Sequence, residues 1–301
     1  MGPKLFTGDT AQVSPVFVCK KIKGVSLSMF AERFQALRKS APLIHNITNY
    51  VTVNDCANMV LACGASPIMA DDQAEAAEIT AICSGLTLNI GTLNDRTIAS
   101  MLLAGKAANA LHHPVVLDPV GAGASALRTQ TALRLLQEIN FTVIRGNLSE
   151  IRTLATGSGG TKGVDAAQTD RICEDTLEPV VRLAKEFSAR TGAIIVITGA
   201  IDVVASPDTA YCIRNGHPIM SSITGTGCQL SALITAFVAA SPDCPLEAAA
   251  AAVCTMGLAG QIAQQRLTAL DGNASCRNYI IDAVYRMTPQ QLEEGACYEV
   301  R

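Results

Sequence analysis

The chain has 301 residues, 49% of them hydrophobic and 16% charged, which suffices for one large α/β domain or two small ones with a sizeable core. Its net charge of −3 provides no general electrostatic attraction to nucleic acid, so we expect no nucleic-acid partner. The longest apolar stretches, residues 230–240 and 248–260, are shorter than the ~20 residues of a membrane-spanning helix and predict buried helices instead.

Residues 1–28 lack the basic and apolar pattern of a signal peptide, and we expect them to form an N-terminal extension. From residue 29 onward, helical patterns alternate with short apolar runs. The helical patterns cover 29–40, 54–65, 73–83, 95–113, 125–139, 148–156, 174–191 and most of the chain after residue 216. The strand patterns cover 43–48, 66–70, 85–91, 114–120, 141–147 and 193–200, and residues 202–206 with 210–216 indicate an antiparallel hairpin.

Short apolar strands between longer helices are typical of βαβ units. They predict a three-layer α/β fold, in which a mostly parallel central sheet has helices on both faces. The chain shows no linker, composition break or internal repeat. We therefore expect a single domain over residues 29–301, without a separate lid domain.

Eleven cysteines are scattered singly along the chain, with no Cys-x-x-Cys pair. Their number is odd and most lie in apolar runs, which fits reduced, buried thiols better than a disulfide framework or a zinc site. Reduced thiols are typical of the cytoplasm, so the sequence predicts a cytoplasmic protein.

The segments that follow the predicted strands are polar and rich in glycine. They are residues 46–49, 118–123, 145–150, 198–202 and 224–228. In a parallel sheet, ligands bind beyond the carboxyl ends of the strands, where the loops enter the helices. The Asp, Asn, Arg, Glu, Thr and Gly of these segments predict a site for a phosphorylated nucleotide with a metal ion.

The tripeptide Gly225-Thr226-Gly227 is predicted to hold an anion at the start of an apolar helix. Glycines let the backbone approach a ligand closely, and the first N–H groups of a helix point outward with the helix dipole behind them. The alternative is a tight turn into a close-packed helix. The four other polar segments favour the ligand site.

Two other phosphate-binding motifs fit less well. Residues 157–163 lack the closing Gly-Lys-Ser/Thr of a Walker A loop. Residues 121–126 match the Gly-x-Gly-x-x-Gly/Ala pattern of a dinucleotide site, but the next strand ends with Arg145 and Asn147, where such a site has an acidic residue. A dinucleotide site is therefore disfavoured.

Six segments carry motifs that occur together, in order and without large gaps. They are residues 42–70, 88–93, 115–125, 143–151, 195–204 and 223–232. Over approximately residues 40 to 265, the chain resembles the hydroxyethylthiazole kinases of the ribokinase-like superfamily. The resemblance implies ATP- and Mg²⁺-dependent phosphorylation of the hydroxyl group of 4-methyl-5-(2-hydroxyethyl)thiazole, in thiamine biosynthesis and salvage. It also implies a homotrimer with active sites at the subunit interfaces.

The resemblance assigns the acceptor side of the site to four positions. It implies that Asn49 and the backbone of Met69 contact the thiazole, and that the amide of Gly225 lies beside the substrate hydroxyl. Cys228 matches the catalytic cysteine of this family, where most ribokinase-like enzymes have aspartate. At a helix start, we expect the amides and the dipole to lower the pKa of the Cys228 thiol. We expect this side chain to position the hydroxyl and to accept its proton late in the transfer.

The nucleotide side of the site comprises six positions. The predicted ATP contacts are Arg145, Thr198, Thr226 and Gly227. Asp118 and Glu150 match acidic residues near the Mg²⁺, in part through water, and this metal prefers oxygen ligands. Ordinary structural interpretations exist beside these roles, since Glu150 and Asn147 also match a capping box and Asp118 also matches a turn residue.

Two other functions stay open at this point. One is a hydroxymethylpyrimidine kinase of the same superfamily. The other is a sensor that binds thiazole or nucleotide without turnover. Asp118, Glu150 and Cys228 together argue against the sensor, because a protein that only binds does not need all three.

Overall fold

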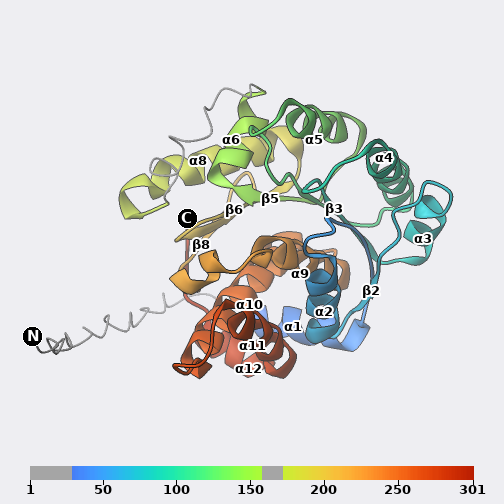
Figure 1. The fold of residues 1–301 in the computed structure, drawn as a ribbon. Helices are drawn as coiled ribbons and strands as arrows, with labels where there is room; N and C mark the ends of the chain where they lie inside the picture. Colours follow the sequence, from blue (N-terminus) through green and yellow to red (C-terminus); the bar gives the residue numbers. More distant parts are fainter. Residues whose placement is uncertain (1–28, 158–171) are drawn as a thin grey trace, which may run out of the picture.

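The computed structural model describes residues 29–157 and 172–301 (Figure 1). The predicted extension at residues 1–28 and most of the glycine-rich stretch 157–163 lie outside these described residues. The described residues confirm the three-layer α/β fold, with a central sheet between two layers of helices.

One sheet of nine strands runs through the described part of the chain, in the order β2-β1-β3-β4-β5-β6-β7-β8-β9. The strands are β1 (Leu43–Ile47), β2 (Ser66–Ile68), β3 (Gly85–Asn89), β4 (Val115–Asp118), β5 (Val143–Asn147), β6 (Ile194–Thr198), β7 (Asp202–Ala205), β8 (Ala210–Ile213) and β9 (Tyr298–Val300). The strands from β2 to β6 in this order pair in parallel, and β6 to β9 pair antiparallel. The predicted parallel sheet and hairpin are confirmed.

Strand β9 is the element that the sequence pattern does not predict. Three residues are too few to show a periodicity, and the strand forms because the outer side of β8 offers it backbone partners. The N–H groups of Ala210 and Arg301 each donate to the carbonyl of the other residue at 2.8 Å.

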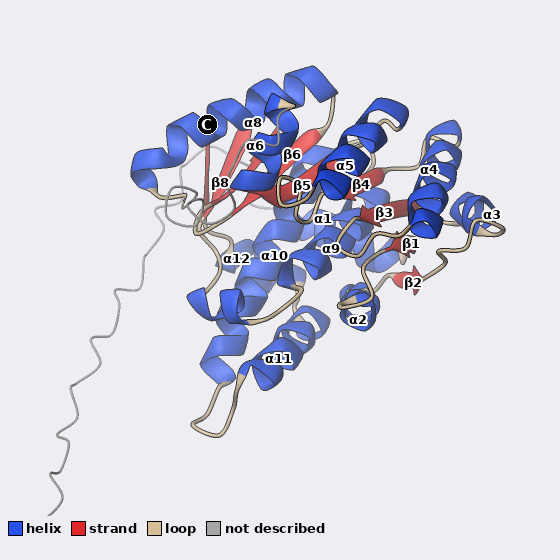
Figure 2. Cartoon of the chain, turned by 45° about the horizontal axis from the view of Figure 1, so that its top comes forward, coloured by secondary structure: helices blue, strands red, loops and turns tan. Residues whose placement is uncertain are grey.

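Helices lie on both sides of the sheet, and Figure 2 shows them in blue around the red strands. They are α1 (Met29–Ser40), α2 (Val53–Cys63), α3 (Ala76–Ile82), α4 (Asp95–Ala110), α5 (Ala126–Glu138), α6 (Leu148–Thr156), α8 (Glu174–Thr191), the 3₁₀ helix η1 (Pro218–Ser222), α9 (Thr226–Ala240), α10 (Pro245–Arg266), α11 (Asn273–Arg286) and α12 (Pro289–Gly295). Helices α1, α2 and α9 to α12 pack on one face, and α3, α4, α5, α6 and α8 pack on the other.

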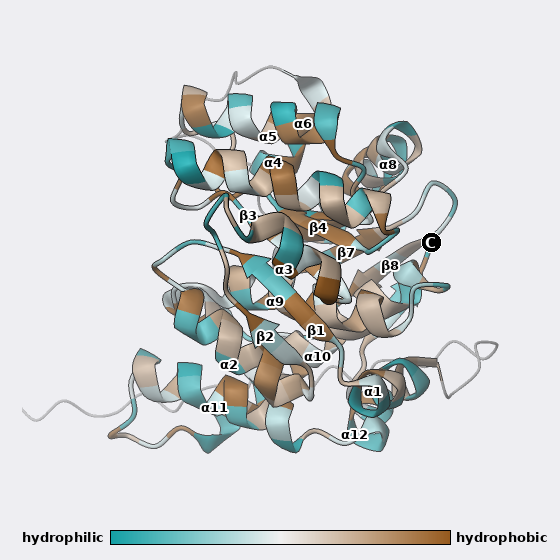
Figure 3. Ribbon diagram, turned by 90° about the vertical axis from the view of Figure 1, so that its right-hand side faces the viewer, coloured by the Kyte–Doolittle hydropathy of each residue, from teal (hydrophilic) through white to brown (hydrophobic). Residues whose placement is uncertain are grey.

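Strand β4 illustrates how the sheet is buried on both faces. Val116 belongs to the same apolar cluster as Phe34 of α1 and Phe237 of α9, whereas Val115 and Leu117 belong to the cluster on the opposite face. Figure 3 shows this strand in brown between the two helix layers. A strand covered on both faces has a continuous apolar sequence rather than an alternating one. This is why the apolar run at residues 114–120 predicts a buried strand.

Within the described residues, one helix, α10, is long and apolar enough to span a membrane by length and composition alone. In its most apolar window, 72% of the residues are buried inside the fold. The alanines at 248–252 are all buried, and their small side chains let α9 and α11 approach closely. The prediction that residues 248–260 form a buried helix is confirmed.

The parallel strands end at one edge of the sheet, where the candidate site lies. Asn89 and Asp118 end β3 and β4 in register, and Asn147 and Thr198 end β5 and β6 in register. One predicted detail is wrong, because the segment 224–228 follows the 3₁₀ helix η1 and not a strand. Its N–H groups still open α9 over this edge.

Candidate active site

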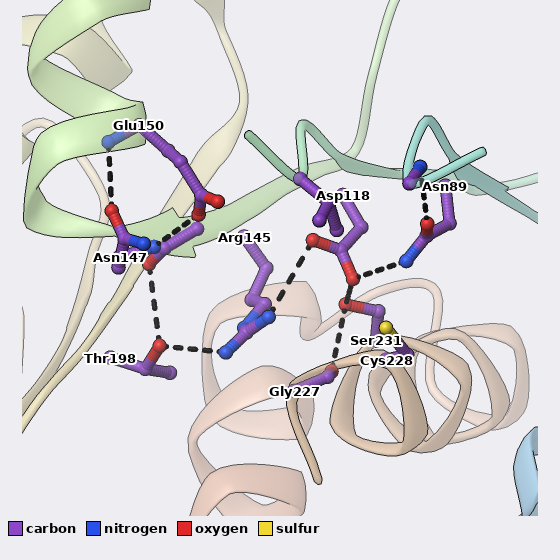
Figure 4. Close-up of polar contacts among 12 residues, drawn as sticks. Asn89, Asp118, Arg145, Asn147, Glu150, Thr198, Gly227, Cys228 and Ser231 are labelled. Carbon is purple, nitrogen blue, oxygen red and sulfur yellow. Dashed lines mark hydrogen bonds and ion pairs between the residues drawn. The ribbon is translucent and has the colours of Figure 1, made fainter. Parts of the chain in front are cut away.

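The side chain of Asp118 lies fully buried at the centre of the site (Figure 4). Its Oδ2 accepts hydrogen bonds from Asn89 Nδ2 at 2.7 Å and from Ser231 Oγ at 2.8 Å. Its Oδ1 accepts no hydrogen bond and lies 3.5 Å from Arg145 Nη1. Burial raises the pKa of Asp118 to about 6, Glu150 adds to this rise, and the Arg145 guanidinium opposes it.

Arg145 connects Asp118 to the rest of the nucleotide side. It lies within β5, two residues before the strand end, and its side chain is 12% exposed. Its Nη2 donates to Thr198 Oγ1 at 2.7 Å. Gly227 packs directly against the guanidinium, since a Cβ on this glycine would overlap Arg145. The structure thus brings together three of the predicted ATP contacts.

Replacing Gly227 with alanine should therefore lower kcat/KM for ATP by about 10- to 100-fold. The added methyl group displaces the guanidinium from Thr198 and Asp118. Initial rates at varied ATP measure the effect. The control is Gly272→Ala, because a Cβ at this exposed glycine meets no atom within 4 Å. Equal kcat/KM values for the two variants would contradict the assigned contact.

Glu150 forms the predicted capping box at the start of α6. The Asn147 side chain accepts from the Glu150 N–H at 2.8 Å, and Glu150 Oε2 accepts from the Asn147 N–H at 2.8 Å. Oε1 accepts from the N–H of Gly121 at 2.8 Å and so holds the loop that follows β4. Each oxygen keeps acceptor capacity beyond these bonds, so the structural interpretation does not exclude a metal role.

Asp118 and Glu150 suit Mg²⁺ rather than a metal ion that is held by protein ligands alone. Among residues 29–157 and 172–301, no group of three or more His, Cys, Asp or Glu side chains could enclose a metal ion. Asp118 offers a buried oxygen without a hydrogen bond, and Glu150 lies close enough to raise the pKa of Asp118. Two carboxylates with waters and phosphate oxygens form a set that Mg²⁺ commonly uses.

The start of α9 is built around Gly225. This glycine has a φ of +82°, and a Cβ on it would overlap Thr52 at the start of α2. Glycine is therefore required for both its backbone conformation and its contact. The first N–H groups of α9 lack partners inside the helix, and Gly227 in this turn packs against Arg145, as expected for an anion site.

Cys228 lies half-buried in the first turn of α9, where Sγ accepts from Asn49 Nδ2 at 3.2 Å. The expected lowering of its pKa is wrong. Burial raises the pKa of the thiol and the Asp118 carboxylate adds to this, while donors on Thr52, Asn49 and Asn89 only partly oppose them. The resting side chain is therefore a thiol near neutral pH.

The two loop positions predicted to contact the thiazole lie in different surroundings. The Asn49 amide is 4% exposed; its oxygen accepts from the N–H and Oγ1 of Thr52, and its nitrogen donates to Asn89 and Cys228. Met69 follows β2, is half-buried and packs against the core cluster of α9. The Asn49 side chain is thus saturated inside the chain, which the sequence does not reveal.

A cavity of about 550 Å³ opens beside the Arg145 guanidinium. All four predicted ATP contacts line it, namely Arg145, Thr198, Thr226 and Gly227. The lining also includes Asp202, from the predicted polar segment 198–202, and six residues that the sequence did not suggest as contacts, namely Asn215, His217, Met220, Leu230, Val253 and Met256. Burial raises the pKa of Asp202 to about 7, and one of its oxygens accepts from the Gly199 N–H at 2.9 Å.

Comparisons with known proteins agree with this geometry. Residues 34–290 match the sequence model of the hydroxyethylthiazole kinase family. A hydroxyethylthiazole kinase from Clostridium acetobutylicum is 61% identical over 271 residues, which cover 90% of this chain and 99% of that protein. One from Desulfovibrio desulfuricans is 50% identical over 80% of this chain and 85% of its own length.

Solved structures are also similar to this chain. The hydroxyethylthiazole kinase protein from Pyrococcus horikoshii OT3 superimposes with a TM-score of 0.79 at 34% identity, covering 90% of this chain and 98% of that chain. The Staphylococcus aureus pyridoxal kinase in complex with ADP superimposes with a TM-score of 0.56, covering 86% of this chain and 97% of that chain. At 14% identity, this likeness shows the fold alone. The chain is therefore a member of the hydroxyethylthiazole kinase family.

Proposed function

We propose that the protein transfers the γ-phosphoryl group of ATP to the hydroxyl group of 4-methyl-5-(2-hydroxyethyl)thiazole, within thiamine biosynthesis and salvage. Membership of the family supports this reaction. The observation that carries it is that Arg145, Thr226 and Gly227 line one nucleotide-sized cavity, while the buried Asp118 lies 3.5 Å behind the guanidinium. Cys228 stands at the same helix start, on the side of Asn49.

Each group has a distinct task in this reaction. Phosphoryl transfer requires alignment and neutralisation of charge, because its transition state is loose. Arg145 and the N–H groups of Thr226 and Gly227 bind phosphate oxygens, and Thr198 fixes the guanidinium. Mg²⁺ bound near Asp118 and Glu150 would neutralise phosphate charge. The Cys228 thiol holds the acceptor hydroxyl at the start of α9, near Gly225. The hydroxyl oxygen bonds to phosphorus as the bond to ADP breaks, and its proton passes late to an oxygen of the transferred phosphoryl group, because Cys228 is already protonated.

The purified protein should form ADP only when the thiazole alcohol is supplied, and the product should be its monophosphate. Phosphorylation of hydroxymethylpyrimidine at an equal or higher rate would replace the substrate assignment. Thiazole binding by calorimetry without ADP formation would identify a sensor instead.

Replacing Cys228 with alanine should lower kcat by about 10- to 100-fold with KM values nearly unchanged. Aspartate at this position should keep or raise activity, because the Asn49 amide would donate to a carboxylate as it does to sulfur. Steady-state kinetics on both variants measure the difference. An inactive Cys228→Asp variant that still binds both substrates would contradict the role.

We expect a homotrimer with active sites between subunits, as in the family resemblance. Tyr50 and Val51, directly after the thiazole-side Asn49, are 78% and 60% exposed, and a neighbouring subunit would cover them. Light scattering at micromolar concentration measures the mass. A monomer would contradict this assembly.

Residues 29–301 act as a single kinase domain, which the one sheet formed by β1 to β9 supports. The enzyme works in the cytoplasm, which is supported by the ten cysteines of the described residues, none of which forms a disulfide.

A further inference from the structure

Asn89 has no task in the proposed reaction, although it belongs to the motif at residues 88–93. It is the last residue of β3, is 2% exposed and lies in register with Asp118. A buried side-chain amide needs hydrogen-bond partners for both its oxygen and its nitrogen. The partners of Asn89 therefore show how its side chain is oriented.

The orientation of the Asn89 amide is set by a backbone donor. The N–H of Gly91 can only donate, and it lies 2.9 Å from Oδ1. The oxygen therefore faces Gly91, and the nitrogen faces Asp118, to whose Oδ2 it donates at 2.7 Å. This bond, together with that from Ser231, leaves Asp118 Oδ1 as the oxygen directed at Arg145.

The other end of Asn89 reaches the acceptor side. Its Oδ1 also accepts from Asn49 Nδ2 at 3.1 Å, and the same Asn49 nitrogen donates to Cys228 Sγ at 3.2 Å. Figure 4 shows Asn89 and Cys228 on the same side of Asp118. A chain of hydrogen bonds thus runs from the thiol through two amides to the buried carboxylate.

We propose that Asn89 is a positioning residue that holds the acceptor side, Asn49 with Cys228, and the phosphate side, Asp118, in one fixed geometry. The inference rests on the proposed function, in which these two sides serve the two reactants. Asn89 acts through its neighbours Asn49, Cys228 and Asp118. In-line transfer tolerates little misalignment, so loss of this link affects the transfer step more than binding.

Three variants test the link. Asn89→Leu removes both ends of the amide at similar volume. Asn89→Asp keeps the acceptor for Gly91 and Asn49 but places an oxygen against Asp118 Oδ2. Ser231→Ala is the matched control, because it removes the other donor to Asp118 and leaves the Asn49–Cys228 contact intact.

Both Asn89 variants should lose about 100-fold in kcat, with KM for ATP and for the thiazole within about threefold of wild type. Ser231→Ala should lose about tenfold. A loss that appears mainly as a higher KM would overturn the proposal. Wild-type kcat in Asn89→Asp would also overturn it. If Asn89→Leu does not fold, Asn89→Asp still provides the test.

Alkylation of Cys228 by iodoacetamide, without nucleotide, metal or thiazole, gives a readout independent of turnover. Cys244, also half-buried, serves as the internal reference in mass spectrometry. Asn89→Leu should slow Cys228 alkylation about fivefold, because the thiolate loses oriented donors, whereas Ser231→Ala should change it less than about twofold. An unchanged or faster rate in Asn89→Leu would overturn the link. If the wild type does not phosphorylate the thiazole, the proposed function fails but this measurement still tests Asn89.

Discussion

Replacing Asp118 with asparagine should lower kcat by about 1,000-fold while the protein remains folded. The asparagine oxygen can accept from Asn89 and Ser231 as Oδ2 does. Its NH₂ group then takes the place of Oδ1, where it cannot bind a cation and faces the Arg145 guanidinium. Kinetics at saturating ATP and thiazole measure the loss. A variant with more than about a tenth of wild-type kcat would contradict the role of Asp118.

The same variant should be more stable than the wild type in metal-free buffer at pH 8. Burial raises the pKa of Asp118 from its ordinary value of 3.8 to about 6, so the folded state binds the proton more tightly than the unfolded state. The cost of the buried charge is absent below about pH 4 and complete above about pH 6. At ~1.4 kcal/mol per pKa unit, the gain at pH 8 is up to about 3 kcal/mol, and urea unfolding at pH 8 and pH 4 measures it. A less stable variant at pH 8 would show that the ion pair with Arg145 outweighs the burial.

Replacing Arg145 with lysine should lower kcat/KM for ATP by about 100- to 1,000-fold, although the charge is kept. The guanidinium simultaneously donates to Thr198, lies 3.5 Å from Asp118 and packs on Gly227. A single ammonium group cannot occupy these positions together. Titration with ATP by calorimetry, alongside kinetics, separates lost affinity from lost turnover.

The control for this substitution is Arg134→Lys on the outer side of α5. Arg134 is 57% exposed and pairs with Glu138, so its replacement should leave the kinetics unchanged. If Arg145→Lys behaved like Arg134→Lys, the phosphate contact would belong to another residue.

The sheet could be predicted from the sequence because its strands are buried on both faces and are therefore continuous apolar runs. The same regularity predicted where the site lies, since parallel strands end together and bring Asp118, Arg145 and Thr198 to one edge. The roles of these residues stay predictions. Their proximity, however, followed from the topology alone.

The contacts that set the chemistry could not be predicted in this way. Ser231 and Asp118 are 113 residues apart in the sequence, and their hydrogen bond depends on how α9 crosses the sheet. The expected lowering of the Cys228 pKa was wrong because burial and the charge of Asp118 outweigh the effect of the helix start, and neither can be read from the local sequence. The internal saturation of Asn49 likewise requires the positions of Thr52 and Asn89.

The two edges of the sheet limit how copies of this chain can associate. At one edge, β2 has three residues with Pro67 at its centre, and proline offers no N–H to an incoming strand. At the other, β9 has three residues and carries Glu299, which pairs with Arg214 and Arg301. Short edges with proline or charge discourage strand-to-strand addition, which is also a route to aggregation. The proposed assembly would therefore use helices and loops, and the exposed Tyr50–Val51 loop beside the site is one surface available to it.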